Sequence, residues 1–372
     1  MPRSGSWIIP KEIRSDMYDI AVVGAGPAGS AFARLAPKHL KIAIIDKRNL
    51  DETGSYVREK CCGGLLAPAA QKELAQQGLG VPVELLSGPQ TFSVKSIDFD
   101  NELIRFYQRH YINIDREGFD RWLVSLTPSN VDKYFESVFT DYIETDNSFR
   151  VRFRNKDGIS EIEARYLVAA DGAASMIRSR AVPEGKEPEK YVSIQDSYLN
   201  KGIPPYYYSI FNKETTDFYS WMIQKGNILH YGTAIPWGSD IIRKHDELAE
   251  KLISRGILSG EFIKRSGAII YRPTKNSGIL LNDGNIFFIG EASGMISPSS
   301  AEGISYALKS GRKLAESFYT SRNPQKAYLK NMRRLRANIA YKNIKSFVMY
   351  NRFLRKIVMK SGLMSIGVEE YD

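Results

Sequence analysis

The feature that most constrains this chain is the glycine-rich segment GAGPAG at residues 24–29. The apolar run before it, residues 19–23, is typical of a strand buried on both faces of a parallel sheet. A helix is predicted from Pro27 to Ala36, where Pro37 ends it. A strand, a tight glycine turn and a helix in this order are typical of a fold that binds a dinucleotide.

Each glycine of this segment has a physical role. Gly24 permits the tight turn, Gly26 lets the backbone approach a pyrophosphate, and Gly29 allows close packing of the helix on the strand. The N–H groups and the dipole of the helix amino terminus favour the negative phosphates. A second buried strand ends at Asp46, where the carboxylate can accept hydrogen bonds from a ribose hydroxyl. Together these features predict a dinucleotide-binding unit.

Two later segments carry similar signals. One is AADGAASMIR at residues 169–178, and the other is IGEASG at residues 289–294, followed by AEGI at residues 301–304. Each alone is compatible with an ordinary strand-to-helix turn. In this order along one chain, they favour a nucleotide-binding domain assembled from separate segments.

The remaining segments predict an α/β protein with a second, β-rich domain. We expect the nucleotide-binding domain at residues 17–90, 113–182 and 280–320, with Asp115 capping a helix and a hairpin turn at residues 156–158. Residues 91–112 and 183–279, strand-like and tyrosine-rich with little helix, are expected to form an inserted, mainly antiparallel substrate domain. Residues 321–372 are predicted to be a basic helical region.

These motifs resemble those of a known class of flavoproteins. The chain is similar to glutathione-reductase-type flavoproteins of the para-hydroxybenzoate hydroxylase class, and within it to the geranylgeranyl reductase family with its bacterial CbrA-like members. The resemblance covers roughly residues 19–315. It rests on GAGPAG, Cys62-Gly63-Gly64, Asp115-Arg116 before Phe119-Asp120, the ADGxxSxxR stretch and GEASG…SPSSAEGISYAL.

The resemblance implies FAD as the cofactor, with a discontinuous Rossmann-type FAD-binding domain. By position, Ala28 and Asp46 would hold the pyrophosphate and the adenosine ribose, Val138 the adenine, and Gly303 the carbonyl region of the isoalloxazine ring. The full set of implied cofactor residues is Gly24, Gly26, Pro27, Ala28, Gly29, Asp46, Lys47, Cys62, Gly64, Arg116, Val138, Asp171, Gly290, Glu291, Gly303 and Ile304. At position 291 most of the class has aspartate reaching the ribityl chain, and the longer Glu291 side chain can still accept that hydrogen bond.

Cys62 and the segment YSWMI at residues 219–223 are the candidates for chemistry. Cys62 would position substrate or donate a proton, or it is simply a small residue fitting tightly beside the flavin. Tyr219, Trp221 and Ile223 alternate onto one strand face, which builds either the wall of an apolar substrate pocket or an ordinary sheet core. The family's proline is absent, because Gln224 stands at its position.

Other titratable residues are weaker candidates. His110 and His230 lie in strand-like stretches among tyrosines, where a structural histidine is the expected reading rather than an acid–base group. No cluster of residues shows metal-ligand spacing. No second dinucleotide turn is visible, so NAD(P)H and ferredoxin-type electron donors both stay open.

The positive charge of the chain is concentrated near its carboxyl end. The formal net charge is +10, and eleven Lys and Arg but no acid lie between Gln325 and Ser361. With its apolar residues, this region is compatible with contact to an anionic membrane surface, or with a solvated face on helices that cover the pocket. No nucleic-acid recognition motif is present, and nucleic acid is not expected.

Cysteine content and hydropathy bear on localisation. The two cysteines, Cys61 and Cys62, are adjacent, which disfavours a relaxed disulfide and favours a reducing compartment. Without an apolar signal core or a long apolar segment, we expect a cytoplasmic protein, with peripheral contact at the inner membrane surface left open.

Three functions remain compatible with the sequence. The first is an FAD-dependent reductase of C=C bonds in an isoprenoid or similarly hydrophobic substrate, by hydride transfer from reduced flavin. The second is a flavin monooxygenase or halogenase, which the same fold supports. The third is a flavoprotein sensor without turnover.

Overall fold

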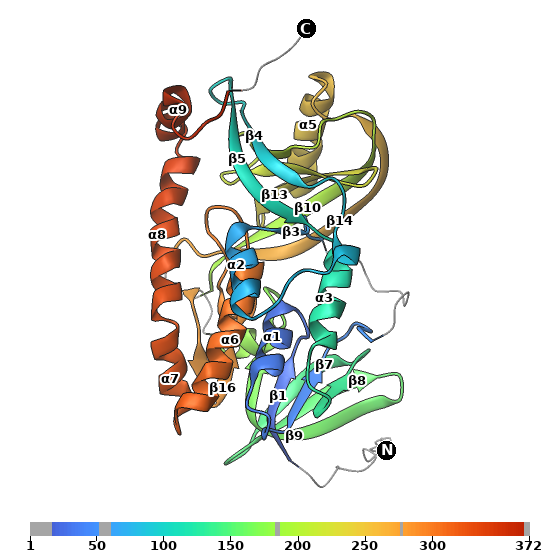
Figure 1. Cartoon of the computed structure of the whole chain (residues 1–372), viewed down its shortest axis with the longest axis vertical. Helices are drawn as coiled ribbons and strands as arrows, with labels where there is room; N and C mark the ends of the chain where they lie inside the picture. The colour runs from blue at the N-terminus through green and yellow to red at the C-terminus, as the bar shows by residue number, and fades with distance from the viewer. Residues whose placement is uncertain (1–16, 52–60, 183–186, 276–277, 368–372) are drawn as a thin grey trace, which may run out of the picture.

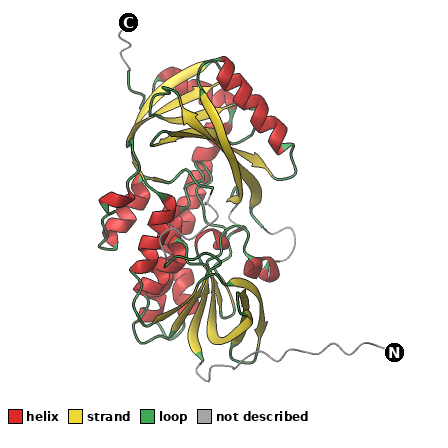
Figure 2. Cartoon of the chain, turned by 90° about the vertical axis from the view of Figure 1, so that its right-hand side faces the viewer, coloured by secondary structure: helices red, strands yellow, loops and turns green. Residues whose placement is uncertain are grey.

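The computed structural model describes residues 17–51, 61–182, 187–275 and 278–367. Two eight-stranded sheets lie at opposite ends of the long axis, with helices between them and along one edge (Figures 1 and 2). This α/β arrangement, with one nucleotide-type sheet, one mainly antiparallel sheet and a helical carboxyl-terminal segment, is the predicted fold class.

The first sheet contains the predicted dinucleotide-type strands. Its order is β15-β16-β9-β1-β2-β6, and β7 and β8 extend it through β9. β1 pairs in parallel with both β2 and β9, and its residues are buried because both faces of the sheet are covered. The strand bounds are β1 Tyr18–Val23, β2 Ile42–Ile45, β6 Val131–Tyr134, β7 Val138–Glu144, β8 Phe149–Asn155, β9 Gly158–Ala169, β15 Asn282–Asp283 and β16 Ile286–Phe288.

Local sequence signals placed several elements of this part correctly. The hairpin turns between Asn155 and Gly158, and Asp115 caps α3 by accepting a hydrogen bond from the Glu117 N–H at 3.0 Å. The helix after the glycine turn, α1, begins at Pro27 as predicted and ends at Leu35. The other elements here are α2 Pro68–Gln76, η1 Val83–Leu85, α3 Arg116–Ser125, α4 Met176–Ala181, η3 Gly290–Ser293 and α6 Ile304–Thr320.

The second sheet has the order β14-β10-β13-β12-β11-β4-β5-β3 and is antiparallel except where β4 runs parallel to β11. Its first strand, β3, is a two-residue segment that follows the Cys62-Gly63-Gly64 segment and pairs with β5. The strand bounds are β3 Leu65–Leu66, β4 Thr91–Asp98, β5 Leu103–Asn113, β10 Glu189–Asn200, β11 Tyr207–Phe211, β12 Ser220–Lys225, β13 Ile228–Pro236 and β14 Gly260–Arg272.

One helix in this region was not expected from the sequence. The 14-residue helix α5 (Ile241–Ser254) buries Leu248 and Leu252 against the second sheet. The prediction of little helix between about 190 and 275 is wrong at this point. The buried residues His245, Leu248, Ala249 and Leu252 recur at helical spacing, so this helix was predictable from the sequence and was overlooked.

Three helices end the described chain, as the sequence predicts: α7 (Pro324–Asn331), α8 (Arg333–Tyr350) and α9 (Arg352–Ser361). They run along one edge of the molecule past both sheets (Figure 1). Ile339 of α8 is buried in the core beside the first sheet, whereas Tyr350 packs on the aromatic cluster of the second. Among the described residues, no helix is both long and apolar enough to span a bilayer.

Candidate functional site

The glycine turn is shaped by close backbone contacts at two of its three glycines. Gly24 has φ +106°, and a Cβ there would lie 2.4 Å from the Ala170 carbonyl oxygen. A Cβ on Gly29 would lie 2.0 Å from the Gly24 carbonyl oxygen, so the helix can pack here only with glycine. Gly26 is different, because its backbone (φ −73°, ψ −175°) suits any residue and a Cβ there would meet nothing within 4 Å.

The structure brings the three nucleotide-type segments together. The Gly24 turn lies against Ala170 and Asp171, and Gly290 packs so closely on α1 that its Cβ would lie 2.9 Å from that of Ala28. The guanidinium of Arg178, which is 1% exposed, donates to the carbonyl oxygens of Ala292 at 2.9 Å and of Gly278 at 2.6 Å, joining the second segment to the third. The three segments therefore lie side by side in the structure, as the predicted discontinuous domain requires.

Asp171 lies beside the turn with an acceptor left free. Its Oδ2 accepts from the Met176 N–H at 3.2 Å, while its Oδ1 is buried and has no hydrogen-bond partner among the described residues. Burial raises the pKa of Asp171 to about 6, against the opposing effect of hydrogen bonds and of Lys47. A buried oxygen without a donor is a natural acceptor for a ligand hydroxyl or N–H group.

A chain of ionic contacts runs from the glycine turn to Cys62. The carboxylate of Asp46 accepts from the Ala25 N–H at 2.7 Å and pairs with Arg48, and Arg48 also donates to Asp120 at 2.8 Å. Asp120 in turn accepts from Arg116 at 2.8 Å.

The Arg116 end of this chain reaches the predicted flavin segment. The Arg116 Nη1 donates to the Cys62 Sγ at 3.4 Å, and the same sulfur accepts from the Gly64 N–H at 3.5 Å. Burial disfavours the charged guanidinium, but Asp120 and Cys62 outweigh burial and raise the pKa of Arg116. Arg48, which the sequence analysis missed, is the link between the two predicted residues Asp46 and Arg116.

The other predicted cofactor residues border this region. Val138, 43% exposed, begins β7 next to Ser137, whose N–H donates to the Asp46 carbonyl at 3.0 Å. Gly303 is the N-cap of α6 and Ile304 its first residue. The Glu291 carboxylate accepts from the backbone N–H of Tyr271 at 2.9 Å, so in this structure it is turned toward β14, and its ribityl contact stays a prediction.

The Cys62-Gly63-Gly64 segment packs against β12 of the second sheet. A Cβ on Gly63 would lie 2.5 Å from the Ile223 Cδ1, and one on Gly64 would lie 2.5 Å from the Lys225 Nζ. At Gly64 glycine is required, because φ is +58° and a Cβ would also lie 2.7 Å from the Ile114 carbonyl oxygen, whereas at Gly63 the contact is with the end of the Ile223 side chain. The segment predicted to pass the flavin and the predicted pocket wall are direct neighbours.

Lys225 is a residue that the sequence analysis missed. Its Nζ donates to the Asn113 Oδ1 at 2.6 Å, to the Ile114 carbonyl at 2.7 Å and to the Gly64 carbonyl at 3.3 Å. Burial lowers the pKa of Lys225 to about 8, and Cys62 and Asp115 partly oppose this. The available signal was a lysine placed directly after the aromatic segment YSWMIQ.

The predicted pocket residues form part of an aromatic cluster. Tyr219, Trp221 and Ile223 are 4–7% exposed, and the Tyr219 and Trp221 rings are 5.7 Å apart. The Tyr219 hydroxyl donates to the Ser300 carbonyl at 2.8 Å, which ties this wall to the loop before α6. The Trp221 Nε1 is buried, and within the part of the chain that the structure describes it has no hydrogen-bond partner.

Of the two histidines considered from the sequence, His230 lies beside the predicted wall, because it pairs with Ile223 across β12 and β13, whereas His110 lies on β5. His230 is buried in β13, where its Nδ1 contacts the Ser197 hydroxyl at 3.0 Å. His110 is exposed on β5 and packs edge-on against Phe92. These surroundings agree with structural histidines.

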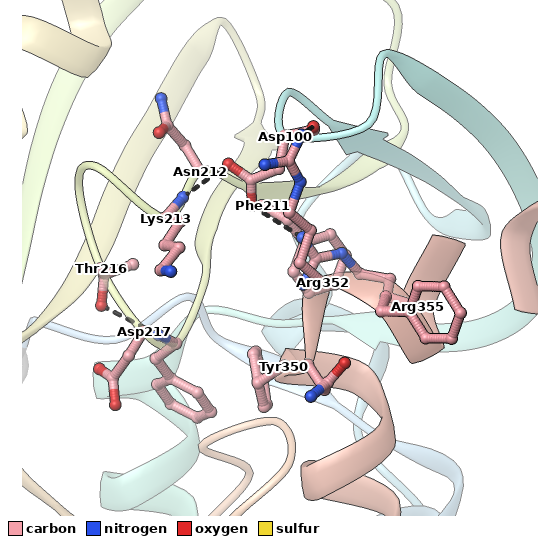
Figure 3. A pocket seen from close by; sticks show the side chains of 12 residues that line it. Asp100, Phe211, Asn212, Lys213, Thr216, Asp217, Tyr350, Arg352 and Arg355 are labelled. Atoms are coloured by element: carbon pink, nitrogen blue, oxygen red, sulfur yellow. Dashed lines mark hydrogen bonds and ion pairs between the residues drawn. The ribbon is translucent and has the colours of Figure 1, made fainter. Parts of the chain in front are cut away.

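A surface cavity of about 390 Å³ lies on the outer side of the aromatic cluster, between the β11–β12 loop and the junction of α8 and α9 (Figure 3). Phe211, Phe218 and Tyr350 give it an aromatic inner side, and the Phe218 and Tyr350 rings are 5.0 Å apart. Lys213 and Arg352 line its outer part with Asp100 and Asp217.

Comparison with protein families identifies the domain that carries the second and third segments. Residues 130–325, more than half of the chain, match the family described as "FAD binding domain". Among curated proteins, CbrA of Escherichia coli is 39% identical over 352 residues, which cover 94% of each chain.

Solved structures of low sequence identity share the fold. A geranylgeranyl bacteriochlorophyll reductase-like protein from Thermoplasma acidophilum superposes with a TM-score of 0.75 at 19% identity, over 93% of this chain and 90% of that one. PqsL from Pseudomonas aeruginosa, described as a probable FAD-dependent monooxygenase, gives a TM-score of 0.69 at 14% identity, over 94% of this chain and all of that one.

Proposed function

Because this chain belongs to the FAD-binding domain family and to the family of CbrA proteins, we propose that it is an FAD-dependent oxidoreductase that reduces C=C bonds of an isoprenoid or similarly hydrophobic substrate. FAD-dependent redox chemistry follows from the family. The bond reduced and the class of substrate are the proposal.

The residues around the glycine turn fit FAD. The space beside Gly26 is open, and α1 begins without a side-chain cap and without an acid in its first turn, so its N–H groups are available to a pyrophosphate. The free Asp171 Oδ1 and the exposed Lys47 border the same turn. We assign these groups, with Asp46, Arg116 and the other residues inferred from the sequence, to the cofactor.

The contact between the Cys62-Gly63-Gly64 segment and β12 carries the proposal. Ile223 lies directly on Gly63, and Trp221 and Tyr219 continue an apolar surface away from it. A flavin beside this segment would face an apolar wall that excludes water and orients a hydrocarbon chain.

Reduction of a double bond requires one hydride and one proton. Reduced FAD supplies the hydride when it is bound. For the proton, two titratable groups lie at the Cys62–Gly64 segment. Cys62 is part of the segment and contacts Arg116, and Lys225 donates to the Gly64 carbonyl. Their part in the reaction is to hold a proton beside the apolar wall.

The likeness to a geranylgeranyl reductase-like protein supports this reaction, whereas the likeness to PqsL supports the alternative, a flavin monooxygenase or halogenase. NAD(P)H and ferredoxin-type donors both remain open as the source of electrons. Cys61 and Cys62, which form no disulfide within the described residues, suit the cytoplasmic setting that belongs to this proposal.

Product analysis under two atmospheres tests the proposal. Chemically reduced, FAD-loaded protein is mixed with geranylgeranyl lipids without oxygen, and in parallel with oxygen and aromatic or halide substrates. We expect flavin reoxidation by the lipid without oxygen, and a product that has gained two hydrogen atoms per bond. Oxygen- or halogen-containing products with no anaerobic reduction would overturn the reductase proposal in favour of the alternative.

A variant of the predicted wall at Ile223 distinguishes a role in the substrate pocket from a role in FAD binding. Ile223→Ala shortens the side chain that contacts Gly63, and Ile242→Ala removes a similar side chain on the exposed face of α5. Only Ile223→Ala should slow lipid-dependent reoxidation, and both variants should bind FAD. Equal rates for all three proteins would contradict the assignment of this wall.

A further inference from the structure

The outer face of α9 combines exposed apolar and basic side chains. Phe353 and Ile357 are 69% and 51% exposed, and Lys356 and Lys360 are exposed between and beyond them. The three- and four-residue spacing of these positions places them on one side of the helix.

The opposite side of α9 is anchored to the second sheet. Arg355, 6% exposed, pairs with Asp98 of β4 at 2.7 Å and with Asp100 at 2.8 Å, and Met359 is buried next to it. The orientation of α9 is therefore fixed by an ionic contact, which keeps its apolar and basic face directed away from the protein.

The neighbouring segments extend this surface. Leu363 and Met364, in the turn after α9, are 62% and 73% exposed. On α8, Tyr341, Ile344 and Phe347 recur at three-residue intervals and are 66–69% exposed. Single exposed apolar residues are ordinary, but a run of them over two helices and a turn is typical of an interaction surface.

The charge of this region has one sign. Residues 317–368 contain no Asp or Glu, while Lys and Arg recur throughout α7, α8 and α9. A surface that is both apolar and cationic matches the interface of an anionic bilayer, where lysines meet phosphates and aromatic or aliphatic side chains enter the acyl boundary.

We propose that this protein docks on an anionic lipid bilayer through the α9 surface, which consists of Phe353, Lys356, Ile357, Lys360, Leu363 and Met364. An acidic protein partner would also be attracted by the lysines, but charge alone leaves the large exposed apolar side chains unaccounted for. Docking needs no turnover, so the proposal goes beyond the proposed function and its failure would leave that function intact.

The cavity at the α8–α9 junction adds a structural reason for docking there. Arg352 lines this cavity (Figure 3). Phe353 lines it as well, and it also belongs to the α9 surface. Behind it, Phe218 stacks edge-on with Tyr219 of the predicted substrate wall at 4.9 Å. Docking through α9 would bring the membrane to the side of the aromatic cluster opposite the Cys62–Gly64 segment.

Vesicle sedimentation of the full-length, FAD-loaded protein tests the proposal. The probes are vesicles of pure phosphatidylcholine and of equal parts phosphatidylglycerol and phosphatidylcholine. Phe353→Ser/Ile357→Ser removes the apolar part of the surface, and Lys356→Gln/Lys360→Gln removes two charges. Ile242→Ser/Ile253→Ser on α5 is the control, because these side chains are similarly exposed at 59% and 51%. FAD content and thermal unfolding show that each variant is folded.

We expect wild-type protein and the α5 control to bind the anionic vesicles alike and phosphatidylcholine much more weakly. The apolar α9 variant should lose about tenfold in partition coefficient, and the lysine variant about fivefold for each charge on anionic vesicles. Failure of the wild type to sediment with anionic vesicles would overturn the proposal. The proposal would also be overturned if the apolar α9 variant bound anionic vesicles as tightly as the wild type does. That result would indicate a purely ionic surface, such as an acidic protein recognises.

Discussion

Gly26 offers a sharp test of the cofactor site, because nothing in the protein itself requires glycine there. Its backbone angles suit alanine, and a Cβ would meet no atom within 4 Å. In Gly26→Ala the gain from a stiffer unfolded chain, about 0.4–1 kcal/mol, is opposed by a poorer helix N-cap of similar size. We therefore expect the unfolding free energy of the FAD-free variant to stay within about 1 kcal/mol of wild type.

FAD binding should respond very differently. A methyl group at Gly26 would stand where the pyrophosphate approaches the first N–H groups of α1. Loss of two hydrogen bonds to a charged group, at about 1.5 kcal/mol each, amounts to about 3 kcal/mol, or roughly a hundredfold weaker binding. Titration of FAD-free protein with FAD, followed by flavin fluorescence, measures this directly.

Gly29→Ala is the matched comparison. Its Cβ would lie 2.0 Å from the Gly24 carbonyl oxygen, so the helix must shift and both stability and FAD affinity should fall. The reasoning would be refuted if Gly26→Ala bound FAD as tightly as wild type. It would equally be refuted if Gly26→Ala destabilised the FAD-free protein as much as Gly29→Ala does.

Three further predictions concern titratable groups. Lys225→Met leaves three acceptors without their donor and should lower the unfolding free energy by about 2 kcal/mol. Turnover of the wild-type protein should fall as pH rises through about 8, because Lys225 then loses its charge. Lys225→Arg should restore the stability and shift this fall in turnover to higher pH. Because burial raises the pKa of Asp171 to about 6, its contribution to the stability of FAD-free protein is full below about pH 4 and is lost as pH rises through 6. Urea unfolding at pH 4 and 7 should show that Asp171→Asn reduces this loss by roughly 3 kcal/mol, and an unchanged difference would contradict it. Asp196 behaves oppositely, since hydrogen bonds from Arg265 and His245 outweigh burial and lower its pKa to about 2. Its contribution of roughly 2 kcal/mol should be present above about pH 4 and lost as pH falls through 2, and acid unfolding of Asp196→Asn should lack that slope.

Sequence signals succeeded where short-range chemistry decides the structure. The glycine turn, the Asp115 cap and the hairpin before Gly158 are each fixed by a few neighbouring residues, and the structure has all three. The assembly of three distant segments was also predictable, because each has a nucleotide-type pattern that is satisfied only when the others lie beside it.

Contacts between distant elements could not be predicted in this way. Arg48 joins Asp46 to Asp120 across 72 positions of sequence, and Lys225 reaches Asn113 across 112. The local sequence of Arg48 does not indicate a buried ionic role, and that of Lys225 offers only its position directly after YSWMIQ. The missed helix α5 has a different cause, because its buried residues recur at helical spacing and the local sequence already carried the signal.

The most direct test of the central claim is an experimental structure of the FAD-loaded protein. Our account predicts the pyrophosphate at the amino terminus of α1 beside Gly26, and the isoalloxazine ring in contact with the Cys62–Gly64 segment, facing Trp221 and Ile223. A ring bound away from that segment, for example in the cavity between α8 and α9, would contradict the assignment of the site and the reaction proposed from it.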